Sequence, residues 1–187
     1  IKTNDLRIIT YKGTHIYTGN GIYTIIYSGN YRVAGVVNIP SSESTPLQLE
    51  HIIMITSVIN NSAVIFLSPP YDMGISGEVY YYWPGTYEPD GDSISYGIVD
   101  PYGSGSYIPP GMSIDAITGD FIWNFPPQAG FYALAFEAME WRNSMIIATT
   151  KREMLIKVDS AITSVGDING NKDIIISPNP TTSRVNL

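Results

Sequence analysis

Short apolar runs alternate with clusters of turn-forming residues along most of the chain. In the first sixty residues, the runs rich in Ile, Val and Tyr are Leu6–Thr10, Ile22–Tyr27, Arg32–Asn38 and Gln48–Thr56. Gly, Asn and Ser separate them, and two prolines interrupt the loop Ile39–Pro46, where they exclude a central strand. No window keeps the 3.6-residue period of an amphipathic helix. The pattern therefore predicts β-strands.

The second half of the chain continues this pattern with more regular spacing. Its predicted strands are Val64–Leu67, Glu78–Tyr82, Ser93–Val99, Met112–Ile114, Phe121–Asn124, Phe131–Met139 and Met145–Val158, with a hairpin turn at Arg142–Ser144. About seven short strands with evenly spaced turns are typical of a two-sheet β-sandwich.

Residues Phe131–Glu140 also allow a helix, because Ala, Leu, Glu and Met favour helical structure. A strand is the preferred interpretation. The turn residues Pro126, Pro127 and Gly130 come first, and large side chains then alternate with smaller or polar ones.

The composition of the chain excludes several kinds of partner and site. The chain has 187 residues, of which 44% are hydrophobic, and a net charge of −7. The negative charge argues against nucleic acid and anionic membrane surfaces as partners, because binding to phosphate needs clustered Lys and Arg. Cysteine is absent, which excludes disulfides, thiolate metal sites and a cysteine nucleophile. No apolar run has the length of a membrane span, so membrane insertion is not expected.

The pattern divides the chain into four predicted parts. Residues 1–62 form a β-sandwich domain, either complete or truncated at its N-terminus, and residues 63–158 form a second sandwich. Residues 159–173 are rich in Gly, Asn, Asp and Ser and are predicted to be a linker. Residues 174–187 are predicted to begin a further domain. The fold class is therefore all-β, with tandem sandwich domains.

A spaced set of motifs in residues 63–158 resembles the bacterial cadherin-like and Ig-like domains. The matches are Gly77-Glu78, the acidic segment Glu88–Asp92 with Ile94 and Tyr96, the hairpin Met112–Trp123 with Asp115, Thr118 and Gly119, and Pro127 with Gly130 and Tyr132. The resemblance implies an Ig-like sandwich with a structural or adhesive role.

The resemblance also implies candidate calcium ligands, because Ca²⁺ binds six to eight oxygen atoms, largely from carboxylates and carbonyls. The candidates are Glu78, Glu88, Asp90, Asp92 and Glu140. The sequence departs from the family pattern in two ways. Glu stands at positions 88 and 140, where Asp is usual. Asn60–Ser62 replaces an Asp-rich linker. The alternative is a β-turn in which the carboxylates cap backbone N–H groups.

A second resemblance lies at the end of the chain. The segment Ile176–Thr182, with Pro-Asn-Pro-Thr inside it, and the alternating Val185–Leu187 resemble the beginning of the C-terminal sorting domain of the type IX secretion system. This implies export by a Bacteroidetes-type bacterium, contact with its secretion machinery, and an extracellular or outer-membrane surface location.

Exposed aromatic residues indicate carbohydrate binding as an alternative function. Trp83 and Trp141 are candidates for stacking on sugar rings, whereas Trp123 is expected in the core. The sequence therefore predicts a non-catalytic structural or adhesive module, in contact with neighbouring domains of the same chain and with surface polysaccharide or protein. The alternative is a carbohydrate-binding accessory module of a secreted enzyme. A carboxylate pair such as Glu137 and Glu140 is not favoured for catalysis, because odd spacing places the two side chains on opposite faces of a strand.

Overall fold

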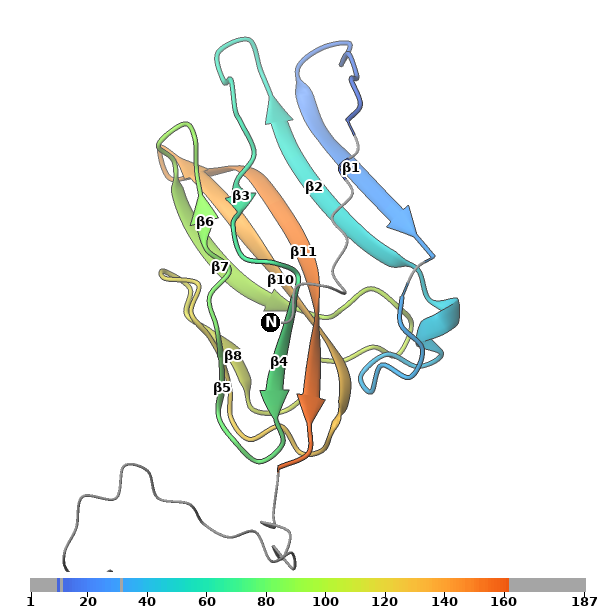
Figure 1. Ribbon diagram of the computed structural model, residues 1–187. Helices are drawn as coiled ribbons and strands as arrows, with labels where there is room; N and C mark the ends of the chain where they lie inside the picture. The colour runs from blue at the N-terminus through green and yellow to red at the C-terminus, as the bar shows by residue number, and fades with distance from the viewer. Residues whose placement is uncertain (1–9, 11, 31, 162–187) are drawn as a thin grey trace, which may run out of the picture.

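A computed structural model of the chain describes residue 10, residues 12–30 and residues 32–161 (Figure 1). This part of the chain consists of β-strands, loops and a three-residue 3-10 turn, η2, and no helix in it is long and apolar enough to cross a membrane. The elements are β1 (Gly21–Gly29), η2 (Ser42–Ser44), β2 (Leu47–Ile55), β3 (Ile65–Phe66), β4 (Tyr71–Ile75), β5 (Tyr80–Tyr82), β6 (Thr86–Tyr87), β7 (Ser93–Val99), β8 (Met112–Ile114), β9 (Phe121–Trp123), β10 (Gly130–Arg142) and β11 (Met145–Asp159).

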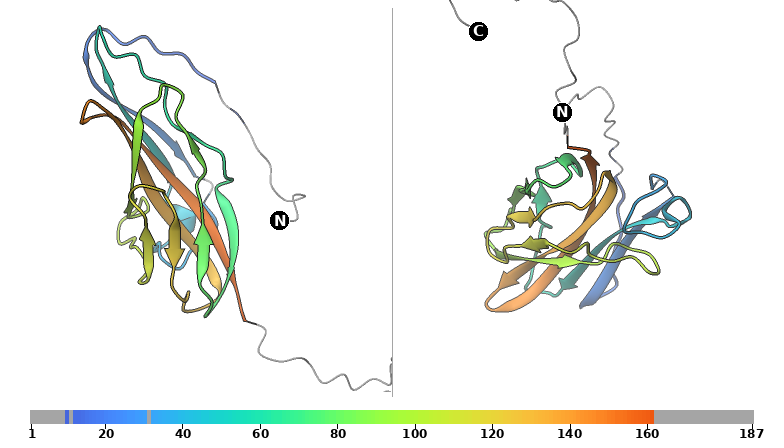
Figure 2. Two further views of the ribbon diagram at one scale, coloured as in Figure 1. Left: turned by 90° about the vertical axis from the view of Figure 1, so that its left-hand side faces the viewer. Right: turned by 90° about the horizontal axis from the view of Figure 1, so that it is seen from below.

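Two packed sheets form a sandwich, which confirms the all-β fold class. The large sheet has the order β1-β2-β11-β10-β7, and β4 joins it by parallel pairing with β11. The small sheet has the order β5-β9-β8, and β3 pairs separately with β6. Figure 2 shows the long hairpin of β10 and β11 running through the molecule, with the shorter strands on one side of it.

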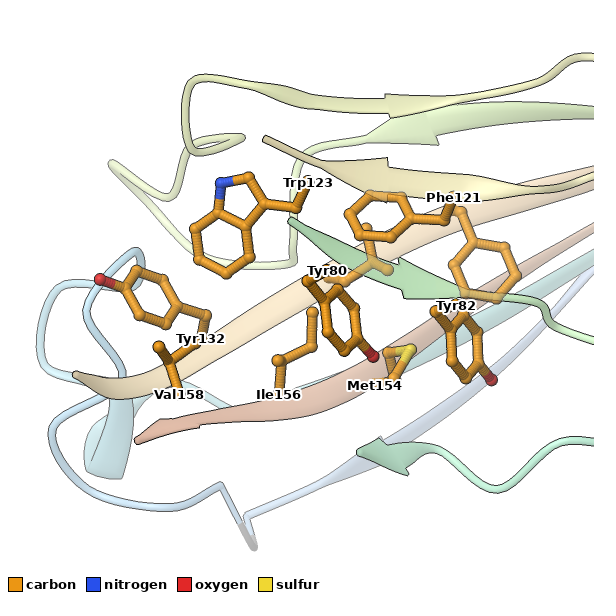
Figure 3. Close-up of a cluster of buried hydrophobic side chains, with 10 residues drawn as sticks. Tyr80, Tyr82, Phe121, Trp123, Tyr132, Met154, Ile156 and Val158 are labelled. Atoms are coloured by element: carbon orange, nitrogen blue, oxygen red, sulfur yellow. The ribbon is translucent and has the colours of Figure 1, made fainter. Parts of the chain in front are cut away.

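The core lies between the large sheet and the small sheet (Figure 3). Trp123 of β9 is fully buried, and its ring meets Tyr132 of β10 edge-on with a centroid distance of 4.7 Å. The buried residues of this cluster are Tyr80, Tyr82, Phe121, Trp123, Tyr132, Leu134, Phe136, Met154, Ile156 and Val158. Alternate residues of β10 and β11 point into the core, as the period of two in a strand requires.

The opposite face of β10 is covered too. The loop before η2 packs Val36 and Ile39 against Ala133, and Asn38 is fully buried beside it. The Asn38 side chain accepts a hydrogen bond from the Ala133 N–H (2.9 Å) and donates one to the Ala133 carbonyl (2.8 Å). Because β10 is buried on both faces, its sequence is almost continuously apolar. Small alanines lie on the face that the loop approaches.

The hairpin β1–β2 extends the large sheet sideways, and Figure 1 shows it at the flank of the molecule, away from β5 and β8. Strand β2 pairs antiparallel with β11, where Ala148 lies opposite Ile53 and Lys151 opposite Glu50. The described residues of 1–62 and of 63–158 therefore share one sheet. The division of the chain into two domains at residue 62 stays a prediction.

Most predicted strands agree closely with the structure, and Ser93–Val99 and Met112–Ile114 agree at both ends. Residues Phe131–Glu140 are a strand rather than the alternative helix. The predicted strand Arg32–Asn38 is wrong, because this segment is a loop with a single bridge from Val36 to Phe131. Leu6–Ile9 and residues 162–187, with most of the linker and the sorting-domain motif, lie outside the described residues.

Candidate functional site

One end of the sandwich carries a polar cluster, here called the acidic cap, made of residues 60–62, 88–92 and 140–142. Carboxylate oxygens of Glu88, Asp92 and Glu140 lie within 4.8 Å of one another. Glu140 is fully buried near the end of β10. It accepts hydrogen bonds from the Val64 N–H (3.0 Å) and from the Asn61 amide (2.7 Å). The cap thus joins three segments that are distant in sequence.

Arg142 supplies positive charge to the acidic cap. Its Nε and Nη2 donate to the two carboxylate oxygens of Asp92 at 2.7 and 2.6 Å, and its Nη1 donates to the Asn60 carbonyl at 3.0 Å. A two-pronged contact of this kind fixes both the carboxylate and the guanidinium. The hydrogen bond to Asp92 raises the pKa of Arg142, with further contributions from the charges of Asp92, Asp90 and Glu88.

The remaining two acids of the cap bind backbone and hydroxyl groups. Glu88 accepts hydrogen bonds from the N–H groups of Asp90 (3.1 Å) and Asp92 (2.6 Å), and Gly91 between them has a φ of +84°. Asp90 accepts bonds from the N–H and hydroxyl of Ser62. This is the capped turn that the sequence offered as the alternative to calcium, with Glu88 as the main capping residue.

Glu78 is not part of the acidic cap. It lies in the turn between β4 and β5, where the neighbouring Gly77 N–H donates to Pro126, just before β10 begins. From Gly130 to Glu140, β10 rises by about 33 Å at roughly 3.3 Å per residue. Figure 1 shows the β4–β5 turn at the opposite end of the sandwich from β6, the strand that leads into residues 88–92 of the acidic cap. The structure therefore brings together the carboxylates of three of the five predicted ligands, Glu88, Asp92 and Glu140. Asp90 lies in the same cap, near Arg142, and Glu78 is separate from all four.

The two candidate tryptophans for sugar stacking lie on different faces. Trp83 follows β5 and is 57% exposed, and the nearby Tyr81 is 67% exposed. Both lie on the outer surface of the small sheet. Trp141 is only partly exposed, and its indole N–H donates to the Ser95 hydroxyl on β7 of the large sheet at 2.7 Å. A single binding platform therefore does not contain both residues.

Glu137, Glu140 and His51 have side chains that could act in catalysis, and Glu140 already accepts two hydrogen bonds in the acidic cap. Glu137 faces away from the sandwich core, on the side of β10 opposite Glu140. His51 of β2 lies within 2.8 Å of the Thr150 hydroxyl, and burial lowers the pKa of its imidazole. These three residues do not converge on one exposed cleft.

Sequence reasoning missed Asn61 and Arg142 as members of the cap, and it missed the buried pair of Arg32 with Glu153. Arg32 donates to both carboxylate oxygens of Glu153, and the side chains are 4% and 6% exposed. One signal in the sequence was available. Lys151, Arg152 and Glu153 form a run of three charged residues in the middle of β11, in a chain that has only ten Lys and Arg residues.

Glu140→Ala is expected to lower the free energy of unfolding by about 1–3 kcal/mol, because Val64 N–H and the Asn61 amide lose their buried acceptor. Urea denaturation measures this loss. Glu137→Ala is the matched control on the opposite face of the same strand, and it should change the stability by no more than about 0.5 kcal/mol. Equal losses in the two variants would contradict the structural role of Glu140.

Calcium binding at the cap stays a prediction. The cap offers three converging carboxylates, and Arg142 already holds one of them, so we expect Ca²⁺ to stabilise the variant Arg142→Gln more than the unaltered chain. The measurement is the Tm with added calcium chloride and then with excess EDTA. If calcium moves neither Tm, the predicted site is wrong.

Comparisons with known proteins show distant likenesses. No family model matches the chain, and no curated protein is significantly similar to it. Two solved structures from Bacteroides fragilis NCTC 9343 resemble it. One is a candidate alpha-galactosidase/melibiase, which matches 55% of this chain at 17% identity and a TM-score of 0.40. The other is a candidate alpha-galactosidase, which matches 56% of this chain at 12% identity and a TM-score of 0.41. This chain covers 19% of the length of each. The tandem Ig repeats of Dlar match 75% of this chain and 83% of theirs, at 7% identity and a TM-score of 0.34. Likenesses this distant carry no argument about what the chain binds.

Proposed function

We propose that this chain is a non-catalytic structural or adhesive module of a secreted or cell-surface protein. The observation that carries the proposal is the exposed flank formed by β1. Ile22 and Ile26 share one face of this strand and are 69% and 53% exposed, and Ile25 on its other face is 47% exposed. Exposed apolar surface of this kind marks contact sites for other proteins.

The free edge of β1 supports the same proposal. Within the described residues β1 pairs only with β2, so its other edge has backbone groups available for a further strand. The nine residues of β1 include no charged residue and no proline, which are the usual protections of an edge strand. A neighbouring domain or a partner protein that adds a strand here would bury both the isoleucines and the unpaired backbone.

Export is a further part of the proposal. It rests on the Pro-Asn-Pro-Thr segment within Ile176–Thr182, which lies outside the described residues. Type IX secretion, an extracellular location and contact with the secretion machinery therefore depend on the sequence resemblance alone.

Bead attachment tests the adhesive role. Beads coated with the unaltered chain should attach to bacterial cells, and Ile26→Lys, which places a charge on the β1 flank, should reduce attachment at least about tenfold. Ile117→Lys is the matched control, because Ile117 is 83% exposed in the turn between β8 and β9. Equal attachment by all three proteins would contradict a role for the β1 flank.

A second candidate function, carbohydrate binding, is favoured by the shallow groove beside Trp83. Tyr81, Trp83 and Ile122 line it together with the carboxylate residue Asp120. Exposed aromatic rings next to a polar group suit the apolar face and hydroxyls of a sugar. On a glycan array, Trp83→Ala should weaken binding at least about tenfold, while Trp141→Ala on the other sheet should leave it unchanged. Loss in both variants or in neither would contradict this groove.

A further inference from the structure

The large sheet divides at β11, and the division leaves a gap along one edge of that strand. Residues Ala148–Lys151 of β11 pair with β2, whereas Leu155–Asp159 pair with β4. Residues 152–154 therefore have neither strand beside them. Figure 1 shows β2 and β4 departing in different directions from β11.

Two cavities occupy this division. One of about 270 Å³ has apolar walls from Leu47, Leu49, Pro70, Met154 and Leu155. The other, of about 380 Å³, lies against Ile25, Tyr27, Leu49 and Phe66. Leu49 and Arg152 line both of them. Together they fall in the range of roughly 300–1,000 Å³ that holds a small ligand.

Arg152, which lies between the two cavities, is a half-buried cation whose charge is not compensated. Its Nη2 donates to the Ser68 carbonyl at 2.5 Å, and its guanidinium carbon lies 5.0 Å from the centre of the Phe66 ring. Its Nη1 is buried without a hydrogen-bond partner among the described residues. The adjacent carboxylate of Glu153 is not available, because it is held by Arg32. Burial also lowers the pKa of Arg152.

The charged groups around the first cavity are Arg32, Arg152 and Glu153, which leaves one positive charge in a protein of net charge −7. From this combination we propose that the cleft between β2 and β11 binds a small amphipathic carboxylate, an unbranched alkanoic acid. The carboxylate accepts hydrogen bonds from Arg152, and the alkyl chain lies along Leu49 and Met154. Binding replaces water at apolar walls and supplies the missing counter-charge.

Titration calorimetry with decanoate tests the site. Decanoate should bind the unaltered chain, and Arg152→Met should weaken binding at least about tenfold, because a charge-assisted hydrogen bond is lost. Lys157→Met is the matched control on the same strand, since Lys157 is partly exposed and paired with Asp159 at 2.9 Å. It should bind decanoate as the unaltered chain does.

Two further measurements do not depend on the folding of Arg152→Met. The uncharged probe 1-decanol has the same chain length and should bind the unaltered protein at least about tenfold more weakly than decanoate. Leu49→Trp, which fills the space shared by the two cavities, should abolish decanoate binding and keep the circular dichroism spectrum. Absence of decanoate binding, equal binding of decanol, or unchanged binding by Leu49→Trp would each overturn the proposal.

Discussion

Trp123→Ala is expected to lower the free energy of unfolding by about 3–5 kcal/mol. The indole is fully buried between the two sheets, contacts the Tyr132 ring, and donates its N–H to the Pro110 carbonyl at 3.1 Å. Removing it leaves a cavity that the surrounding strands fill only in part. Urea denaturation followed by far-ultraviolet circular dichroism measures the change.

Trp83→Ala is the matched control for that experiment. Its side chain is 57% exposed, so its removal should change the stability by no more than about 0.5 kcal/mol. If the two substitutions cost the same, Trp123 is not the centre of a packed core.

Arg32→Ala is expected to cost about 3–5 kcal/mol, because it leaves the Glu153 carboxylate buried without its counter-charge. The same substitution removes donors to the carbonyls of Thr45 and Pro46, so the loop that covers β10 also loses its anchor. Chemical denaturation measures the loss. The double variant Arg32→Met/Glu153→Leu should recover most of it, because apolar pairs of similar volume can replace a buried ion pair.

The pH dependence of the Arg32→Ala loss provides an independent check. Burial raises the pKa of Glu153, and the hydrogen bond and charge of Arg32 oppose that rise. When folding raises the pKa of a carboxyl group, the free energy of unfolding of the protein falls as the pH increases. This fall begins near the ordinary pKa of the group, 4.5, and continues through its pKa in the folded protein. Without Arg32 the folded pKa rises further. The deficit of the variant should therefore be smaller at about pH 5 than at about pH 7.5. A deficit that does not change with pH would contradict this origin.

The strands of the sandwich were predictable where side-chain alternation and turn chemistry agree. The turn between β10 and β11 is one example, since Asn143 and Ser144 both have positive φ in a tight hairpin. The loop at Arg32–Asn38 was mistaken for a strand because it has strand-like composition. The Asn38 side chain makes the bonds to Ala133 that a strand backbone would make, and no local pattern reveals that contact.

The acidic cap was predictable only in part. The resemblance and the spacing of acids predicted Glu88, Asp92 and Glu140 as calcium ligands; their carboxylates converge, and calcium binding stays a prediction. Glu78 was grouped with them although strand lengths place it at the other end of the sandwich. Arg142 was overlooked because its role depends on a contact with Asp92, which is fifty residues earlier in the sequence. Similarly, β4 has little signal of its own and exists through parallel pairing with β11.

Turnover of glycosides by the purified chain tests whether its buried charges serve architecture rather than catalysis. Nitrophenyl glycosides and soluble polysaccharides are incubated with the unaltered chain and with the variants Glu137→Gln and Glu140→Gln, and released product is measured. We expect no release above the protein-free blank for any of the three. Product formed by the unaltered chain and lost in both variants would show a working carboxylate pair, and these charges would then serve catalysis.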